Sequence, residues 1–256
     1  MKRMISIFLA LILTLGLCAC GSGSKEETEL SDDWEYDVPE EPMWTTGLEE
    51  GEVIEITSDM LLEWRDQARK KMKRITLDDV MKVEPLSEDH MNCSHIGERE
   101  CEVINGPNPQ QQKICAFPET WYGQKIVKIG NDAFTMGKFN GLRLPDSLRE
   151  LGESAFSSSD YLQIVYCGSG LKTIGLGAFE ACLNLHTVVL PEGLERIGAC
   201  AFQGTSLQSI EIPASVTEIG DYAFNCLLNE DFVIIGTPGS YAEQYAAEQG
   251  IPFQPK

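Results

Sequence analysis

The chain has 256 residues, 43% of them hydrophobic, which is enough for one or two folded domains with a buried core. Its 40 Asp and Glu residues outnumber its 20 Lys and Arg residues, and the formal net charge is −20. Such an acidic chain repels phosphate backbones, so nucleic acid is not expected as a partner.

The first residues have the pattern of an export signal. Two basic residues at positions 2 and 3 precede the apolar run 4–17, which is too short to span a membrane as a stable helix. The run ends in LCACG, and an apolar residue three positions before Cys20, among small residues, resembles the lipobox of bacterial lipoproteins. The resemblance implies that residues 1–19 are a cleaved signal peptide and that Cys20 carries the lipid. An ordinary secretory signal with an incidental Cys is the alternative.

Residues 20–57 are expected to form an acidic, disordered tether. Positions 25–59 hold fourteen acidic residues and one Lys. A segment with so much like charge has too little apolar surface to offset the entropy of ordering it, and self-repulsion extends it. With a lipid on Cys20, this tether would hold the folded part of the chain away from the membrane.

Residues 58–113 are interpreted as a small N-terminal module that contains helices. Apolar residues at helical spacing predict one helix over about 59–74. A second, short helix is expected over 76–82, with Thr76 as its N-cap. Residues 85–112 are expected to contain a hairpin that leads into the rest of the chain.

This module also gathers residue types that bind soft metals, namely His90, Cys93, His95 and Cys101. Thiolate and imidazole ligands suit zinc or copper, although the spacing matches no familiar zinc finger. In an exported chain, a disulfide from Cys101 to Cys93 or to Cys115 is the alternative, as are free thiols. No orienting residue or oxyanion site accompanies these cysteines, so neither catalysis nor a cofactor is expected.

A phrase of the form [Ile or Leu]-Gly-x-x-Ala-Phe occurs five times, starting at positions 129, 151, 174, 197 and 219. A fixed period of 22 or 23 residues is typical of a solenoid of stacked leucine-rich coils. Alternating apolar residues before a Pro or Gly column predict one short strand per coil with a buried face. The Phe of each phrase is expected in the core, and its Gly is expected to allow a turn with positive φ.

The repeat unit L-x-x-[VI]-x-[LI]-P-x-x-[LV]-x-x-I-G-x-x-A-F, as in residues 207–224, resembles the BspA-like leucine-rich repeats of bacterial surface proteins. Residues 117–130 look like the first coil of that family, and residues 239–253 are similar to its terminal cap helix. The resemblance implies an α/β repeat fold over 114–256, a solenoid of short strands joined by turns or short helices. It also implies exposure on the cell and adhesion or binding of host components, without naming a ligand.

The outward side of the predicted strands is the candidate ligand-binding site. If residues one and three before the column point inward, those two and four before it point outward. Because adjacent coils lie about 4.8 Å apart, the outward residues should form an exposed patch that marks a binding site. The predicted patch consists of Ile164, Tyr166, Thr187 and Val189, with Phe232 and Ile234 further along the stack. Burial of these residues under the N-terminal module is the alternative.

These features predict a non-catalytic lipoprotein on the extracytoplasmic side of a bacterial cell membrane. Its lipid would anchor it to the membrane, and its repeats would bind an extracellular protein or glycan. The alternatives are a structural or assembly partner of other envelope proteins, and a metal-binding N-terminal module.

Overall fold

The computed structural model describes residues 63, 72, 74–106, 114–225 and 231–256. The expected signal peptide, the lipid site at Cys20, the tether and most of the helix over 59–74 lie outside the described residues. The chain divides into two compact units, Met1–Met72 and Lys73–Lys256, and the account below concerns the second. In the ranges that the structure describes, no helix combines the length and the apolar character needed to cross a bilayer.

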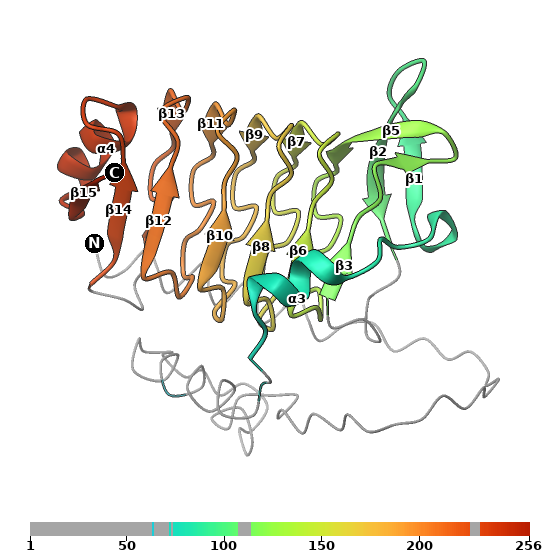
Figure 1. The fold of residues 1–256 in the computed structure, drawn as a ribbon, viewed down its shortest axis with the longest axis horizontal. Coiled ribbons are helices and arrows are strands. Elements are labelled where there is room, and N and C mark those ends of the chain that lie inside the picture. Colours follow the sequence, from blue (N-terminus) through green and yellow to red (C-terminus); the bar gives the residue numbers. More distant parts are fainter. Residues whose placement is uncertain (1–62, 64–71, 73, 107–113, 226–230) are drawn as a thin grey trace, which may run out of the picture. The chain divides into compact units, whose positions relative to one another are not determined.

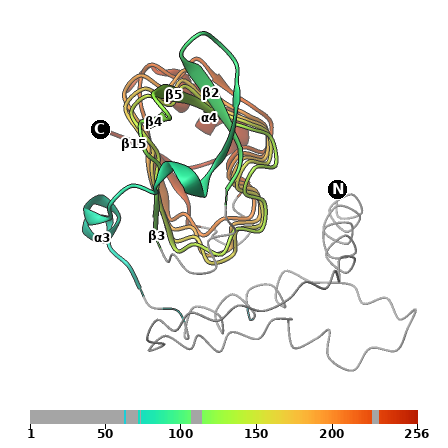
Figure 2. The ribbon, with the colours of Figure 1, turned by 90° about the vertical axis from the view of Figure 1, so that its right-hand side faces the viewer.

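The second unit is a solenoid in which successive coils stack on one another (Figure 1). Figure 2 looks along the stack and shows the coils overlying each other. One side of the stack is a long sheet with the strand order β1-β2-β5-β7-β9-β11-β13, to which β4 adds by pairing with β5. Its strands are β1 (Asn92–His95), β2 (Glu100–Asn105), β4 (Thr120–Trp121), β5 (Gln124–Ile129), β7 (Glu150–Leu151), β9 (Thr173–Ile174), β11 (Arg196–Ile197) and β13 (Glu218–Ile219).

The other side of the stack consists of two short sheets, with the orders β10-β8-β6-β3 and β12-β14-β15. Their strands are β3 (Ile114–Ala116), β6 (Gly141–Arg143), β8 (Ile164–Tyr166), β10 (Thr187–Val189), β12 (Ser209–Ile212), β14 (Val233–Gly236) and β15 (Phe253–Pro255). The strands that successive coils contribute pair in parallel. This pairing is that of a β-solenoid of leucine-rich repeats.

The five Phe residues of the repeated phrase form a column through the core, as the sequence predicts. Rings of neighbouring coils stack with centroids 5.4–5.5 Å apart and planes tilted by 4–11°. The column consists of Phe134, Phe156, Phe179, Phe202 and Phe224, all of them buried. No single coil has enough apolar partners of its own, so each ring depends on the coils next to it.

The expectation of a positive φ at the Gly of the repeated phrase is wrong. A Cβ added at Gly175 would lie 2.7 Å from the carbonyl carbon and oxygen of Gly152 in the preceding coil. Gly152, Gly198 and Gly220 face a neighbouring backbone at similar range. Each Gly is therefore required because two backbones approach closely, which is a different reason from turn geometry.

Positive φ occurs two residues later, at the same position of every coil. The φ angles there lie between 52° and 59°, although four of the five residues are not glycine. These residues are Asp132, Ser154, Gly177, Cys200 and Tyr222. The left-handed region costs a residue with a Cβ about 1–2 kcal/mol, so stacking imposes this turn against local preference.

The last coil has a different register from the one that the sequence predicts. β12 and β14 pair with Ile210 opposite Ile234 and with Ile212 opposite Gly236, one position away from the expected alignment. Because side chains alternate along a strand, this shift turns the other set inward. Phe232 and Ile234, which were expected on the exposed patch, are 4% and 0% exposed.

Within residues 74–106, 114–225 and 231–256, two helices pack against the solenoid. The short helix expected over 76–82 is present as α3 (Leu77–Lys82), and Thr76 and Asp79 form a reciprocal capping box at its start. The expected hairpin is also present, because β1 pairs antiparallel with β2 after a 3₁₀ turn at Glu88–His90. β2 then pairs in parallel with β5, so this hairpin extends the long sheet.

At the other end, α4 (Tyr241–Gln249) buries its apolar side against the final strands. Ala242, Tyr245 and Ala246 are the buried residues of this helix. The Tyr245 ring meets Phe224, the last ring of the Phe column, edge to face at 6.1 Å. Gly250 ends the helix with a left-handed φ of 68°.

We predict that Gly175→Ala destabilises the solenoid. The added methyl group would overlap the backbone of the preceding coil, and such overpacking costs about 1–3 kcal/mol of unfolding free energy. Urea denaturation measures the loss. Gly97→Ala is the matched control, since its Cβ would meet only the Glu100 side chain, at 3.5 Å. Equal stability of the two variants would contradict the close approach between coils.

We also predict that Ser154→Gly stabilises the protein by about 0.5–1 kcal/mol. The substitution removes a Cβ from a residue with φ of 52°, which outweighs the entropy that glycine adds to the unfolded chain. Ser169→Gly, at an exposed serine without positive φ, should instead lose stability by up to about 1 kcal/mol. Thermal unfolding of both variants shows whether each gains or loses stability. A loss of stability in both would contradict the backbone strain inferred at Ser154.

Candidate functional site

The structure brings together the four residues of the predicted patch. β8 and β10 pair in parallel, with Ile164 opposite Thr187 and Tyr166 opposite Val189. Residues that alternate along a strand share a face, so all four side chains lie on the outward side of the short sheet. Tyr166, Thr187 and Val189 are half-buried, which leaves part of each available to a ligand.

Ile164 is not available, and its place in an exposed patch is a correction to the sequence-based expectation. It is only 3% exposed, and α3 packs against β8, as well as against β3 and β6. Figure 2 shows α3 outside the coils on the side of β3. The alternative that residues before the repeats cover this face therefore holds for Ile164.

Arg143 fastens α3 to the strand face. Its guanidinium donates hydrogen bonds to the carbonyl oxygens of Met81 and Val83, at 2.7 and 2.6 Å. A cation near the last carbonyls of a helix satisfies acceptors that have no partner within the helix. Just before the start of α3, the backbone N–H of Ile75 donates a hydrogen bond to Gln163 Oε1 at 3.3 Å.

Arg143 occupies an outward position of β6, opposite Tyr166 of β8, and the sequence pattern alone gives it no role. Gly141 was the signal that a helix covers this strand. A Cβ there would lie 2.8 Å from Ile75 Cδ1 and 2.9 Å from Val80 Cγ2. Gly141, an outward residue without a side chain, makes room for the helix, and Arg143 on the same strand holds it by hydrogen bonds.

Beyond α3, the outward side of the strands is accessible at Tyr166 of β8 and over β10 and β12. We call this surface the open strand face and define it by Tyr166, Thr187, Val189, Ser209 and Glu211. Ser209 and Glu211 are exposed, and β10 is half-buried at all three of its residues. At the far edge of this surface, Lys256 forms ion pairs with Glu211 and with Glu192, the second at 3.6 Å. The face thus has an apolar and hydroxyl-bearing centre and a charged edge.

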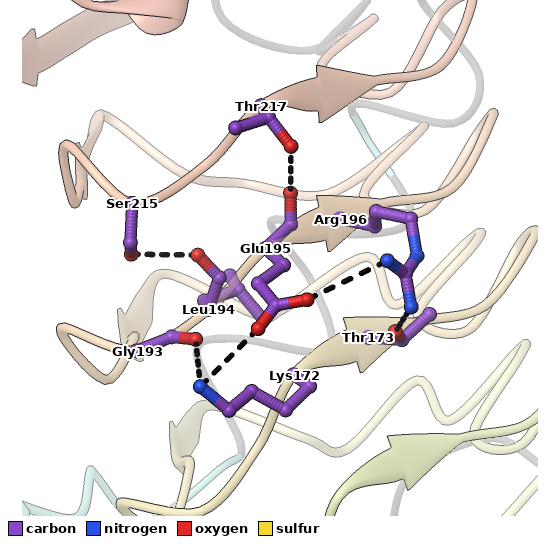
Figure 3. A network of polar contacts seen from close by, with 8 residues as sticks. All are labelled: Lys172, Thr173, Gly193, Leu194, Glu195, Arg196, Ser215 and Thr217. Carbon is purple, nitrogen blue, oxygen red and sulfur yellow. Dashed lines mark hydrogen bonds and ion pairs between the residues drawn. The ribbon is translucent and has the colours of Figure 1, made fainter.

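The opposite side, the long sheet, carries charges that pair with one another. Glu195 accepts ion pairs from Lys172 at 3.3 Å and from Arg196 at 3.6 Å, as Figure 3 shows. Arg196 also donates to Thr173 Oγ1 at 2.8 Å, and Lys172 to the Gly193 carbonyl at 3.0 Å. Similar pairs join Lys128 to Glu102 and Glu150, and Arg149 to Glu100. All of these ion pairs except Arg196–Glu195 bridge neighbouring coils, and charges that already have partners offer little to a ligand.

The residues proposed as metal ligands are only partly brought together. Cys93, His95 and Cys101 share one face of the β1–β2 hairpin, while the side chain of His90 lies outside the described residues. His95 Nδ1 is already hydrogen-bonded to Gln124 Oε1, at 2.6 Å. Among the described residues, no three His, Cys, Asp or Glu side chains are placed to hold a metal ion together.

The cysteine thiols of the described residues are not activated nucleophiles. Burial raises the pKa of Cys93, Cys115 and Cys167 to about 12. A nucleophilic cysteine requires a lowered pKa, because the thiolate is the reacting species. Burial thus favours the protonated form of these three thiols at neutral pH.

Asp160, in the turn before β8, is a carboxyl group in an unusual environment. It is half-buried, and burial raises the pKa of its side chain to about 7. The same carboxylate contributes to the raised pKa of Cys182. The folded protein thus disfavours the ionised form of Asp160, because burial is the cause of the raised pKa and no cation counts among its causes.

We predict that Asp160→Asn stabilises the protein at pH 8 but not at pH 4. A carboxyl with a raised pKa contributes its full stability below its unfolded pKa of about 4, and that contribution is lost as pH rises through about 7. The amide has no proton to lose, so the gain at pH 8 should be about 1–2 kcal/mol. Denaturation at a series of pH values tests this, with exposed Glu153→Gln as the control. A gain that is independent of pH would contradict it.

Comparisons with known proteins agree with this geometry. Residues 113–229 match the family model described as BspA type leucine rich repeat region, in six copies. A leucine-rich repeat protein of T. pallidum has the same fold at 24% identity, with a TM-score of 0.55 over 59% of this chain and 71% of that chain. One from Bacteroides ovatus is 30% identical, with a TM-score of 0.50 over 59% of this chain and 40% of its own length. No curated protein matches the sequence.

Proposed function

Because residues 113–229 of this chain belong to the BspA-type leucine-rich repeats, which are typical of bacterial surface proteins, we propose that the chain is a non-catalytic binding protein of the cell surface. Its ligand is an extracellular protein or glycan. The repeats supply a rigid scaffold, and the open strand face supplies the contacts.

The observation that carries this proposal is the composition and exposure of the open strand face. Tyr166 and Val189 lie side by side and are half-buried, with Thr187 next to them on the same face. A tyrosine fixed by neighbouring strands offers a large apolar surface and a hydroxyl at low entropic cost, which suits both protein and sugar ligands. The paired charges of the long sheet offer no comparable surface.

A lipid on Cys20, after removal of residues 1–19, is the proposed means of attachment. The lipobox-like sequence and the acidic segment that follows it support this part of the proposal. The lipid would anchor the chain on the extracytoplasmic side of the bacterial membrane, and residues 20–57 would act as the tether. Residues 58–113 would be a module in front of the repeats, and α4 would cap their C-terminal end.

We predict that the double variant Tyr166→Ala/Val189→Ser loses ligand binding while it stays folded. The purified chain would be tested on an array of matrix proteins, mucins and glycans. Removal of a central aromatic and its apolar neighbour should weaken binding at least tenfold, equivalent to about 1.4 kcal/mol. Thermal unfolding would confirm that the variant is folded.

The matched control is Thr217→Ala/Glu218→Ala, which changes two exposed residues on the long-sheet side. It should bind as the unchanged chain does. Binding that survives the first variant but not the control would move the site to the long sheet. Absence of any binding by the unchanged chain would favour the alternative of an envelope protein as partner, for which co-purification from the source membrane is the next experiment.

A further inference from the structure

The β1–β2 hairpin brings two cysteines together at the N-terminal end of the stack. Cys93 lies opposite Val103 and Cys101 lies opposite His95, so the two cysteines occupy diagonal positions on one face of the hairpin. Both are free thiols in this structure, and the neighbouring Cys101 is, after burial, one of the causes that raise the pKa of Cys93. Two thiols on the same face of paired strands can be joined by a two-electron oxidation to a disulfide.

We propose that Cys93 and Cys101 form a disulfide across the hairpin when the folded chain meets an oxidised low-molecular-weight thiol. Cys115, the other partner that the sequence allows for Cys101, lies on β3 in a different sheet. Its thiol is buried, and its strand pairs with β6 and not with the hairpin. The shared face of the hairpin therefore favours Cys93 as the partner of Cys101.

The reaction is a thiol–disulfide exchange that balances without a further reagent. The thiolate of Cys93, the less buried of the two residues, attacks an external disulfide, and one thiol leaves with the proton that Cys93 has lost. The thiolate of Cys101 then attacks the sulfur of Cys93 in this mixed disulfide and releases the second thiol. Two protein thiols are oxidised to one disulfide, and one external disulfide is reduced to two thiols.

The backbone can accommodate the bond with a small movement. Diagonal residues of an antiparallel pair have Cα atoms about 7–8 Å apart, whereas disulfides usually join Cα atoms about 4.4–6.8 Å apart. Closing the bond thus requires a shift of roughly 1 Å. In the part of the chain that the structure describes, β1 is the edge strand of the long sheet and pairs only with β2, so it can move without breaking another strand pairing there.

Burial sets the pace of this reaction. Burial is the largest cause that raises the pKa of Cys93 to about 12, and the neighbouring Cys101 raises it further. Burial also raises the pKa of Cys101. Little thiolate is present at neutral pH, so exchange should be slow there and should accelerate as pH rises. The proposed disulfide is accordingly a slowly formed structural link and not the centre of a rapid redox catalyst.

Peptide mapping tests the proposal, because trypsin separates the three candidate cysteines. Cleavage after Lys82, Arg99, Lys113 and Lys125 places Cys93 in peptide 83–99, Cys101 in 100–113 and Cys115 in 114–125. The purified full-length chain would be incubated with glutathione disulfide, unfolded, alkylated and digested. We expect peptides 83–99 and 100–113 to be joined, and the joined species to disappear after reduction with dithiothreitol.

A link between peptides 100–113 and 114–125, or alkylation of both Cys93 and Cys101 after oxidation, would overturn the proposal. Oxidation should also raise the Tm of the unchanged chain and of Cys200→Ser, but not that of Cys93→Ser. Peptide mapping of the unchanged chain decides the matter even if Cys93→Ser folds poorly. None of these readouts involves a ligand, so the result is independent of the function proposed for the open strand face.

Discussion

The close approach of one coil's backbone to the next is the constraint on which the rest of this structure depends. At Gly152, Gly175, Gly198 and Gly220 there is no space for a Cβ, because the neighbouring backbone occupies it. Two residues later the chain adopts a left-handed conformation at Asp132, Ser154, Cys200 and Tyr222, which costs local free energy, most clearly at the last three. Stacking therefore determines the local geometry, and the Phe column is the apolar core that this spacing allows.

The same repetition decides where a ligand can bind. A regular stack produces two outward sides, and the structure uses them differently. Several charges of the long sheet form ion pairs between coils, whereas the short sheets are divided between a part covered by α3 and an open part. The cover is held by two hydrogen bonds from Arg143, so a residue outside the repeated pattern sets the boundary of the available surface.

Much of this architecture can be predicted from the sequence, because a repeat presents each feature several times. The period gives the stack, the alternation of apolar residues gives the buried strand faces, and the Phe column follows from the phrase that contains it. The short helix at 77–82 is recognisable from its capping residues, Thr76 and Asp79. These features depend on local pattern, which the sequence shows directly.

The errors have a common origin in contacts between segments that are far apart in sequence. Ile164 is buried by a helix some 80 residues earlier, and no periodicity records that contact. Phe232 and Ile234 turn inward because the last coil pairs one position away from its expected register. The role of the repeat Gly was misassigned because its close neighbour is the preceding coil, and not its own turn.

The two ends of the stack differ, and this difference bears on how the solenoid keeps its shape. In a repeat protein each coil is stabilised by its neighbours, so the terminal coils are the first to open. At the C-terminal end, Tyr245 of α4 packs on the last ring of the Phe column. At the N-terminal end, the outermost strand among the described residues is β1, which pairs there with β2 alone. Cys93 and Cys101 lie diagonally across this pair of strands, where a covalent link would oppose fraying most directly.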